Sequence, residues 1–136
     1  MAFNSELLRK LVTVYGPSSR EHLIREMISE EIQDYVDELY TDALGNLIAH
    51  KKGPGKKIMI SAHMDQIGLI VTDIDKDGFV RFGNIGGISP AVTFSQRVIF
   101  ENNTIGAVYS EPVDDLSKLK LEDMFIDIGA KSKEEA

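Results

Sequence analysis

The sequence has 136 residues, none of which is cysteine or tryptophan. Without cysteine the chain can form neither disulfides nor thiolate metal sites, which fits a protein of the cytoplasm. It also has no apolar stretch near the roughly 18 residues that a membrane helix needs. Its N-terminus lacks the basic flank and apolar core of a signal peptide. We therefore expect a cytoplasmic protein without a membrane-spanning or secretory segment.

Basic residues are the scarcer charge, since 15 Lys and Arg stand against 22 Asp and Glu, a net charge of -7. This balance repels phosphate backbones and anionic lipid surfaces, so neither nucleic acid nor a membrane is an expected partner. Hydrophobic residues make up 43% and charged residues 27%, which is typical of a chain that folds. The length allows one ordinary domain or two small lobes.

Two helices are expected ahead of residue 36. Asn4 or Ser5 can cap the first helix, which ends at the Gly-Pro pair 16–17. Ser18 and Glu21 form a capping box, the pattern that opens a second helix. Both helices carry apolar residues at helical spacing: Leu7, Leu8, Leu11, Val12 and Tyr15 in the first, and Leu23, Ile24, Met27, Ile28, Ile32 and Tyr35 in the second.

After Val36 the hydrophobic period falls to about 2, and β-favouring segments follow one another. Strands are expected at 38–42, 46–51, 58–62, 68–74, 79–82, 97–101, 105–110 and 124–128, with turns at 77–78 and 102–103. The segment 58–62, Ile-Met-Ile-Ser-Ala, is apolar without alternation, which is typical of a central strand covered on both faces. The pattern predicts an α/β fold with a lobe boundary near residue 67.

The residues that follow the apolar segment are the strongest candidates for chemistry. His63 and Asp65 stand at the carboxyl end of the expected strand, where open α/β sheets place their ligands. In extended chain, residues two apart point to the same side, so both can face one site. His63 could then offer an imidazole nitrogen to a metal, and Asp65 could hold the ring in orientation. The alternative is a hydrogen-bonded histidine at a domain edge.

The segment 73–78, Asp-x-Asp-x-Asp-Gly, imitates the first half of a calcium-binding EF-hand loop. The twelfth position would be Asn84 instead of glutamate, and no helix pattern follows, so an aspartate-rich hairpin turn is the favoured interpretation. His22 and His50 are expected to face solvent. The sequence shows no phosphate-binding glycine loop, and no Cys or Ser nucleophile with a plausible His partner.

Ser132 and Glu135 form a second capping box, so a helix is expected to begin there. Because an isolated helix needs more than one turn to persist, this start signal so near residue 136 suggests a sequence that has been cut short. A frayed tail rich in Lys and Glu is the alternative.

Five segments together resemble one family in their order and spacing: 16–21 (GPSSRE), 42–49 (DALGNLIA), 62–68 (AHMDQIG), 85–87 (IGG) and 125–136 (FIDIGAKSKEEA). That family is the tetrahedral two-metal aminopeptidases, which include glutamyl and deblocking aminopeptidases and relatives labelled endoglucanase. The resemblance spans essentially the whole chain.

The resemblance implies a partial three-layer α/β/α metallopeptidase lobe in residues 1–66 and a β-rich, barrel-like dimerisation insert in 67–124. Residues 125–136 would return to the catalytic domain and be cut at a helix start. His63 would ligate one metal of a zinc or cobalt pair, and Asp65 would orient that ligand. Homodimers would assemble into dodecamers, and N-terminal residues of peptides would be removed by a metal-activated water with a glutamate as general base.

The family's other metal ligands and its general base would lie beyond residue 136, so the chain alone is expected to be inactive. Ser19 replaces a glycine that is common in the family, and the loop 111–120 lacks the Pro-His pair of many members. Two other interpretations stay open. One is a non-catalytic self-association module, and the other is a glycan hydrolase, for which the sequence marks no pair of facing carboxylates.

Overall fold

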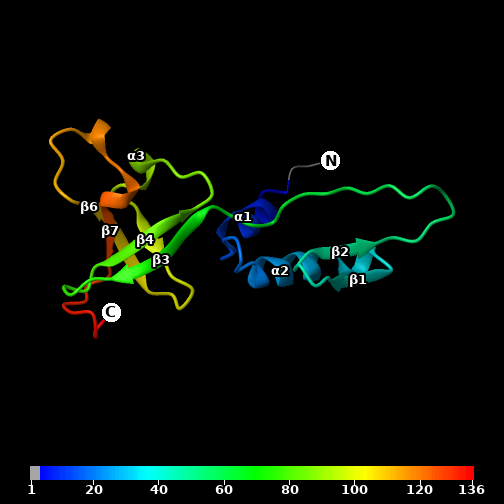
Figure 1. Ribbon diagram of the computed structural model, residues 1–136. Helices are drawn as coiled ribbons and strands as arrows, with labels where there is room; N and C mark the ends of the chain where they lie inside the picture. The colour runs from blue at the N-terminus through cyan, green and yellow to red at the C-terminus, as the bar shows by residue number, and fades with distance from the viewer. Residues whose placement is uncertain (1–3) are drawn as a thin grey trace. The chain divides into compact units, whose positions relative to one another are not determined.

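The computed structural model describes residues 4–136 and divides the chain into two compact units, one ending at Gln66 and the other beginning at Ile67 (Figure 1). Each unit has its own sheet, two-stranded in the first and five-stranded in the second. No helix in the described part of the chain combines the length and the apolarity needed to cross a membrane. The chain is a mixed α/β protein, as the sequence pattern predicts.

The two expected helices open the first unit. Helix α1 (Ser5–Thr13) begins where Asn4 caps it, because the Asn4 side-chain oxygen accepts a hydrogen bond from the Leu7 amide at 3.0 Å. Helix α2 (His22–Ile32) continues into a short 3-10 turn, η1 (Gln33–Tyr35). The helical spacing of the apolar residues therefore predicts both elements correctly.

The connection between these helices is tight because a glycine lets the chain approach α2. Gly16 lies against Ile24, whose side chain is only 2% exposed. A Cβ atom added at position 16 would be 2.7 Å from the Ile24 Cγ2 atom, closer than carbon atoms approach in a packed interior. Position 16 therefore requires a residue without a side chain.

The capping box expected for the second helix does not form. The Ser18 hydroxyl donates to Asp65, and the Glu21 carboxylate accepts from the Ser19 amide at 2.6 Å. Helix α2 consequently has no side-chain cap and begins at His22. The prediction was wrong because a partner 47 residues away competes for the serine hydroxyl, and a local pattern cannot register such a partner.

The first two expected strands form a hairpin in the first unit. Strands β1 (Glu38–Thr41) and β2 (Leu47–His50) pair in antiparallel register. The Oδ1 atom of Asp42 accepts from the amides of Leu44 and Asn46, both at 2.9 Å, which closes the connecting turn.

The expected central strand at 58–62 is not a strand in the structure but an extended, exposed segment (Figure 1). The side chains of Ile58, Met59 and Ile60 are 88%, 89% and 93% exposed. Within residues 4–136, no strand pairs with this segment. A strand needs neighbours that donate and accept backbone hydrogen bonds, and the described residues supply none at this place. The prediction of a covered strand is therefore wrong for this chain.

The second unit is an antiparallel sheet of five strands in the order β3-β4-β7-β6-β5 (Figure 1). Its strands are β3 (Gly68–Ile74), β4 (Val80–Ile85), β5 (Arg97–Ile99), β6 (Ile105–Ser110) and β7 (Met124–Asp127). Three short elements complete the unit: α3 (Pro90–Thr93), η2 (Leu116–Lys118) and η3 (Leu121–Asp123). All five strands are confirmed predictions, whereas the three short helical elements were not expected.

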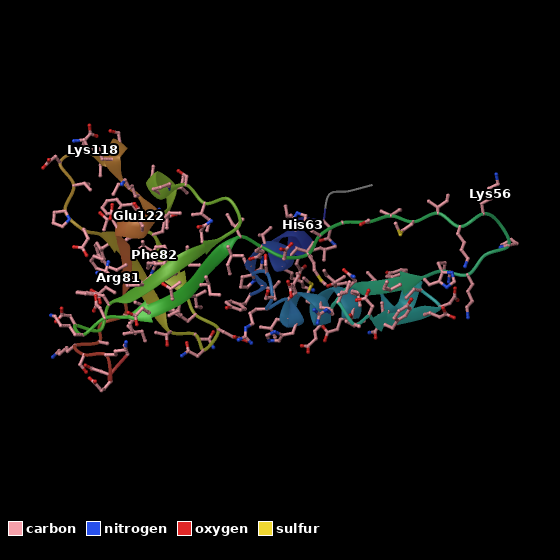
Figure 2. All side chains as sticks on the ribbon, in the orientation of Figure 1. Lys56, His63, Arg81, Phe82, Lys118 and Glu122 are labelled. Carbon is pink, nitrogen blue, oxygen red and sulfur yellow. The ribbon has the colours of Figure 1, made fainter. Side chains whose placement is uncertain are left out.

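One face of this sheet carries a hydrophobic core. Its buried side chains are Val80, Phe82, Val108, Leu119, Met124 and Ile126, of which Figure 2 labels Phe82 on β4. Ile126 is register partner to both Val80 and Val108, so three neighbouring strands place large apolar side chains on the same face. The second unit thus encloses a core of its own.

Strand β7 lies in the middle of the sheet, between β4 and β6. Residues 125–127, which the sequence analysis assigned to a return segment, are part of this strand, and Ile126 is buried in the core. The sheet of the second unit therefore runs through residue 127, past the expected end of the insert at residue 124.

The last residues form a turn. The Ser132 hydroxyl accepts from the Glu135 amide at 3.3 Å, as in a capping box, but the Glu135 carboxylate accepts from the Lys131 amide at 2.8 Å. No helix follows within the described residues.

Candidate functional site

His63 and Asp65 lie side by side in the chain that follows the exposed apolar segment. The His63 Nδ1 atom is 3.0 Å from Asp65 Oδ1 and 3.1 Å from the Asp65 backbone oxygen. Because both neighbours are acceptors, Nδ1 carries the proton in the neutral ring, and Nε2 is the nitrogen with a free lone pair. The His63 side chain is 86% exposed, and Figure 2 shows it on the extended segment. The ring is therefore oriented but open to an incoming ligand.

Ser18 is a third member of this arrangement, which the sequence analysis missed. Its hydroxyl donates to Asp65 Oδ2 at 2.5 Å. The Ser18 hydroxyl, and after it the His63 ring, hold the pKa of Asp65 below its usual value. Since a serine at this place also suits a helix cap, the local pattern offered another explanation. The only sequence signal for a contact between Ser18 and Asp65 was that the segments 16–21 and 62–68 occur together in one family.

The backbone around Ser18 is fastened to the segment that carries the site. The Gln66 amide donates to the Gly16 oxygen at 2.9 Å, and the Ser18 amide donates to the Gln66 oxygen at 3.4 Å, forming a short parallel bridge. The Gln66 side-chain amide donates to the backbone oxygens of Val14 at 3.1 Å and Leu11 at 3.4 Å. Gln66 therefore pairs with carbonyl groups that the end of α1 leaves without helical partners.

An open hollow of about 1450 Å³ is lined by α2, the β1-β2 hairpin and the extended segment, including His63 and Asp65. Pockets that enclose a small ligand measure about 300–1,000 Å³ and bury most of the ligand surface. The hollow is larger than this and lies beside the exposed run 58–62. The described residues therefore do not enclose a substrate by themselves.

The donors present fit one part of a metal site. Metal-ligating histidines usually give their other ring N–H to a carboxylate or a carbonyl, and His63 has both at hydrogen-bond distance. Across residues 4–136, however, no three or more His, Asp or Glu side chains converge to hold an ion. A tetrahedral zinc site needs three or four protein ligands. The chain thus supplies one imidazole, and further donors would have to come from other residues.

The aspartates of 73–78 form a turn, as the favoured interpretation predicts. The Asp75 Oδ1 atom accepts from the amides of Asp77 at 3.1 Å and Phe79 at 3.0 Å, within the β3-β4 hairpin. Asp73 and Asp77 each pair with a lysine, at 2.9 Å and 2.6 Å. Their carboxylates are engaged by backbone amides and cations and do not converge as calcium ligands do.

The other two histidines lie outside this arrangement. His22 is the exposed first residue of α2. His50 is half-buried on β2, and its Nδ1 atom is 3.1 Å from Glu38 Oε2 across the hairpin. His50 is therefore occupied by a contact within the β1-β2 sheet.

Comparison with known proteins supports the resemblance that the sequence motifs indicate. A protein of Acetivibrio thermocellus, whose name assigns it provisionally to the aminopeptidases, is 54% identical over 132 residues, covering 96% of this chain and 40% of its own length. The structure of the Pyrococcus horikoshii TET1 peptidase, which can assemble into a tetrahedron or a large octahedral shell, is 37% identical with a TM-score of 0.82. The match covers 96% of this chain and 42% of that one.

A third similar protein carries a different label. The structure of a Thermotoga maritima protein described as an endoglucanase is 39% identical with a TM-score of 0.84, covering 95% of this chain and 40% of that one. The chain therefore spans about two fifths of the length of the relatives that it matches.

The sequence profile of the M42 glutamyl aminopeptidases matches residues 45–136, more than half of the chain. The matched part includes both members of the His63–Asp65 pair. The resemblance read from the motifs is confirmed, and the chain belongs to the M42 glutamyl aminopeptidase family.

Proposed function

We propose that this chain forms the first part of a divalent-metal aminopeptidase, which removes N-terminal residues from peptides. The observation that carries the proposal is the His63–Asp65 pair, in which a carboxylate holds the Nδ1 proton and leaves Nε2 for an ion. In this role His63 is a metal ligand and Asp65 orients it. Membership of the aminopeptidase family supports the substrate class.

The chemistry divides between the ion and the protein. When bound, a divalent ion supplies Lewis acidity for hydrolysis of the peptide bond. Zinc or cobalt, with two ions in each site of the intact protein, suits an imidazole ligand. His63 presents Nε2, and Asp65 keeps the proton on Nδ1. The general base and the other ligands lie outside these residues, so the chain alone is inactive, and the lack of cysteine fits a cytoplasmic enzyme.

We assign residues 1–66 to the catalytic lobe, which is a three-layer α/β/α fold in the intact protein. The run 58–62 becomes its central strand, and further strands fill the hollow beside it. The almost complete exposure of Ile58 and Ile60 supports this assignment. A run of large apolar side chains left in water usually marks a surface that other residues cover in the intact protein. The hollow of about 1450 Å³ supplies the space.

Residues 67–127, which hold the five-stranded sheet, are assigned to a barrel-like insert through which subunits dimerise, and residues 128–136 lead back to the catalytic lobe. The separate core of the second unit supports an insert that folds around its own side chains. The assembly of the Pyrococcus horikoshii peptidase into a tetrahedron or an octahedral shell supports self-association of the intact protein. We propose that this protein forms dodecamers built from dimers.

A chimera tests the proposed function. Residues 1–136 are joined to the part of the Acetivibrio thermocellus relative that follows its matched region, and hydrolysis of aminoacyl anilides is measured with zinc or cobalt. We expect hydrolysis by the chimera and none by the 136-residue chain. His63→Ala should reduce hydrolysis by at least about 100-fold. His22→Ala is the matched control and should retain the activity, because His22 is the exposed first residue of α2 and does not line the hollow beside His63.

Equal hydrolysis by the chimera and its His63→Ala variant would contradict the ligand assignment. Two other functions give different results with the same proteins. A self-association module would form stable oligomers without hydrolysing any anilide. A glycan hydrolase would act on carboxymethylcellulose above a metal-free control, an assay that the Thermotoga maritima relative justifies.

A further inference from the structure

The Ser18 hydroxyl has no role in the proposed function, although it touches the site. We propose that Ser18 is a positioning residue, which fixes the Asp65 carboxylate by a hydrogen bond and thereby orients the His63 ring for its ligand. The catalytic meaning of this role rests on the proposed function. The geometry itself lies entirely within the first unit of this chain.

Asp65 divides its two carboxylate oxygens between two partners. Oδ1 lies 3.0 Å from His63 Nδ1, and Oδ2 accepts from the Ser18 hydroxyl at 2.5 Å. The last torsion of an aspartate side chain is broad, so a carboxylate held by one hydrogen bond can rotate. With both oxygens engaged, rotation breaks at least one bond. Ser18 therefore sets the plane of the carboxylate, and the ring follows that plane.

Ser18 can act as a fixed point because it stands on the well-packed side of the site. The turn that carries it packs against buried Ile24 and is bonded to the backbone of Gln66 in both directions. On the other side of His63, residues 53–62 are exposed and pair with no strand of the described chain. The position of the ring is therefore determined from the side of Gln66, through Ser18.

The role requires a hydroxyl and not only a side chain of this size. Ser18 does not cap α2, which has no side-chain cap. Threonine keeps the hydroxyl donor, cysteine has nearly the same shape but is a weak donor, and alanine has no donor. The three substitutions at position 18 therefore separate hydrogen bonding from packing.

The experiment measures the tautomer of His63 by nitrogen-15 NMR in the complete 136-residue chain without metal. Spectra are recorded under alkaline conditions, at which the nitrogen-15 shifts of the ring no longer change with pH. In the native chain we expect the Nδ1–H tautomer to dominate. Ser18→Ala should raise the Nε2–H fraction at least about threefold, Ser18→Cys should raise it less, and Ser18→Thr should restore the native ratio.

Ser61→Ala is the matched control. Ser61 is two residues from His63 but is exposed, and its hydroxyl makes no hydrogen bond among the described residues, so the tautomer ratio should not change. His50 is an internal reference in every spectrum, because its Nδ1 contact with Glu38 does not involve Ser18. Amide signals of α1 and α2 report whether each variant keeps the fold of the first unit.

Three results would overturn the proposal: a native His63 that is mainly Nε2–H, a Ser18→Ala chain that keeps the native ratio, or a folded Ser18→Thr chain that loses it. If the Ser18→Ala chain does not fold, the His63 tautomer of the native chain and of the Ser18→Cys and Ser18→Thr variants still tests whether Ser18 positions the ring.

The chimera separates this inference from the proposed function. If the chimera is an active peptidase, Ser18→Ala should lower its kcat/KM by about 10- to 100-fold, and Ser18→Thr should recover it. A tautomer that responds to Ser18 in a chimera without peptidase activity would refute the proposed function and leave the positioning role intact. An active chimera in which the His63 tautomer does not change with the residue at position 18 would refute the positioning role and leave the proposed function intact.

Discussion

The two units differ in how completely they bury their apolar residues. The second unit encloses a core of six buried side chains around strands β4, β6 and β7. In the first unit, Ile24 is the one fully buried apolar side chain among the described residues, while Ile58, Met59 and Ile60 face solvent. Burial of apolar surface is the main favourable term in folding. The second unit therefore has the larger driving force to fold alone, and the first unit has a smaller one.

This difference bears on function because the candidate site lies in the less complete unit. The imidazole ring of His63 is held by Asp65, which Ser18 holds in turn, and no hydrophobic core packs around these side chains. Such an arrangement suits a surface that other residues complete. The following changes test the comparison between the units.

The largest effect is expected in the core of the second unit. Ile126→Ala should lower the free energy of unfolding of this unit by about 3 kcal/mol, because deletion of a buried isoleucine side chain leaves a cavity. Urea unfolding followed by amide signals of β4 and β7 measures the loss. Ile105→Ala, which replaces an exposed side chain, should cost less than about 0.5 kcal/mol. An equal loss at amides of α1 and α2 would show that the units are not independent.

A smaller effect is expected at the helix connection of the first unit. Gly16→Ala should lower the free energy of unfolding of this unit by about 1–3 kcal/mol, because the added methyl group overlaps Ile24. Hydrogen exchange of α1 and α2 amides measures it. The control Gly53→Ala places a methyl group where nothing lies within 4 Å. If both variants are equally stable, the close packing of position 16 against α2 is refuted.

A gain of stability is expected at position 19. Ser19 has a φ of 73°, in the left-handed region that favours glycine. Ser19→Gly should therefore raise the free energy of unfolding of the first unit by about 0.5–1 kcal/mol. The same change at Ser61, which has no positive φ, should give no gain because glycine only adds disorder to the unfolded chain. Thermal unfolding of the two variants decides between these outcomes.

The smallest effect is expected in the exposed run. Ile60→Ser should change the free energy of unfolding of this chain by less than about 0.5 kcal/mol, because the side chain is already in water. In the chimera the same substitution should cost at least about 2 kcal/mol, since the proposed catalytic lobe covers the run. Equal costs in both proteins would contradict the assignment of 58–62 as a covered strand.

The second sheet could be predicted well because its signals are local. Burial alternates along β6 and β7, and Gly78 and Asn103 adopt positive φ at the two expected turns. The segment 58–62 has an equally strong apolar signal, but a strand exists only where neighbouring backbone groups pair with it. The capping box predicted at Ser18 is wrong for a related reason, because the Ser18 hydroxyl donates instead to the carboxylate of Asp65, which is distant in the sequence.

By itself, the amino-acid sequence determined helices α1 and α2, the five strands of the second unit, the family and the identity of the His63–Asp65 pair, because each depends on residue spacing or on short motifs. Only the tertiary structure decided that Ser18 joins this pair and that the run 58–62 stays exposed. Hydrogen bonds between residues far apart in the chain depend on where the backbone travels in space, and no local pattern encodes that path.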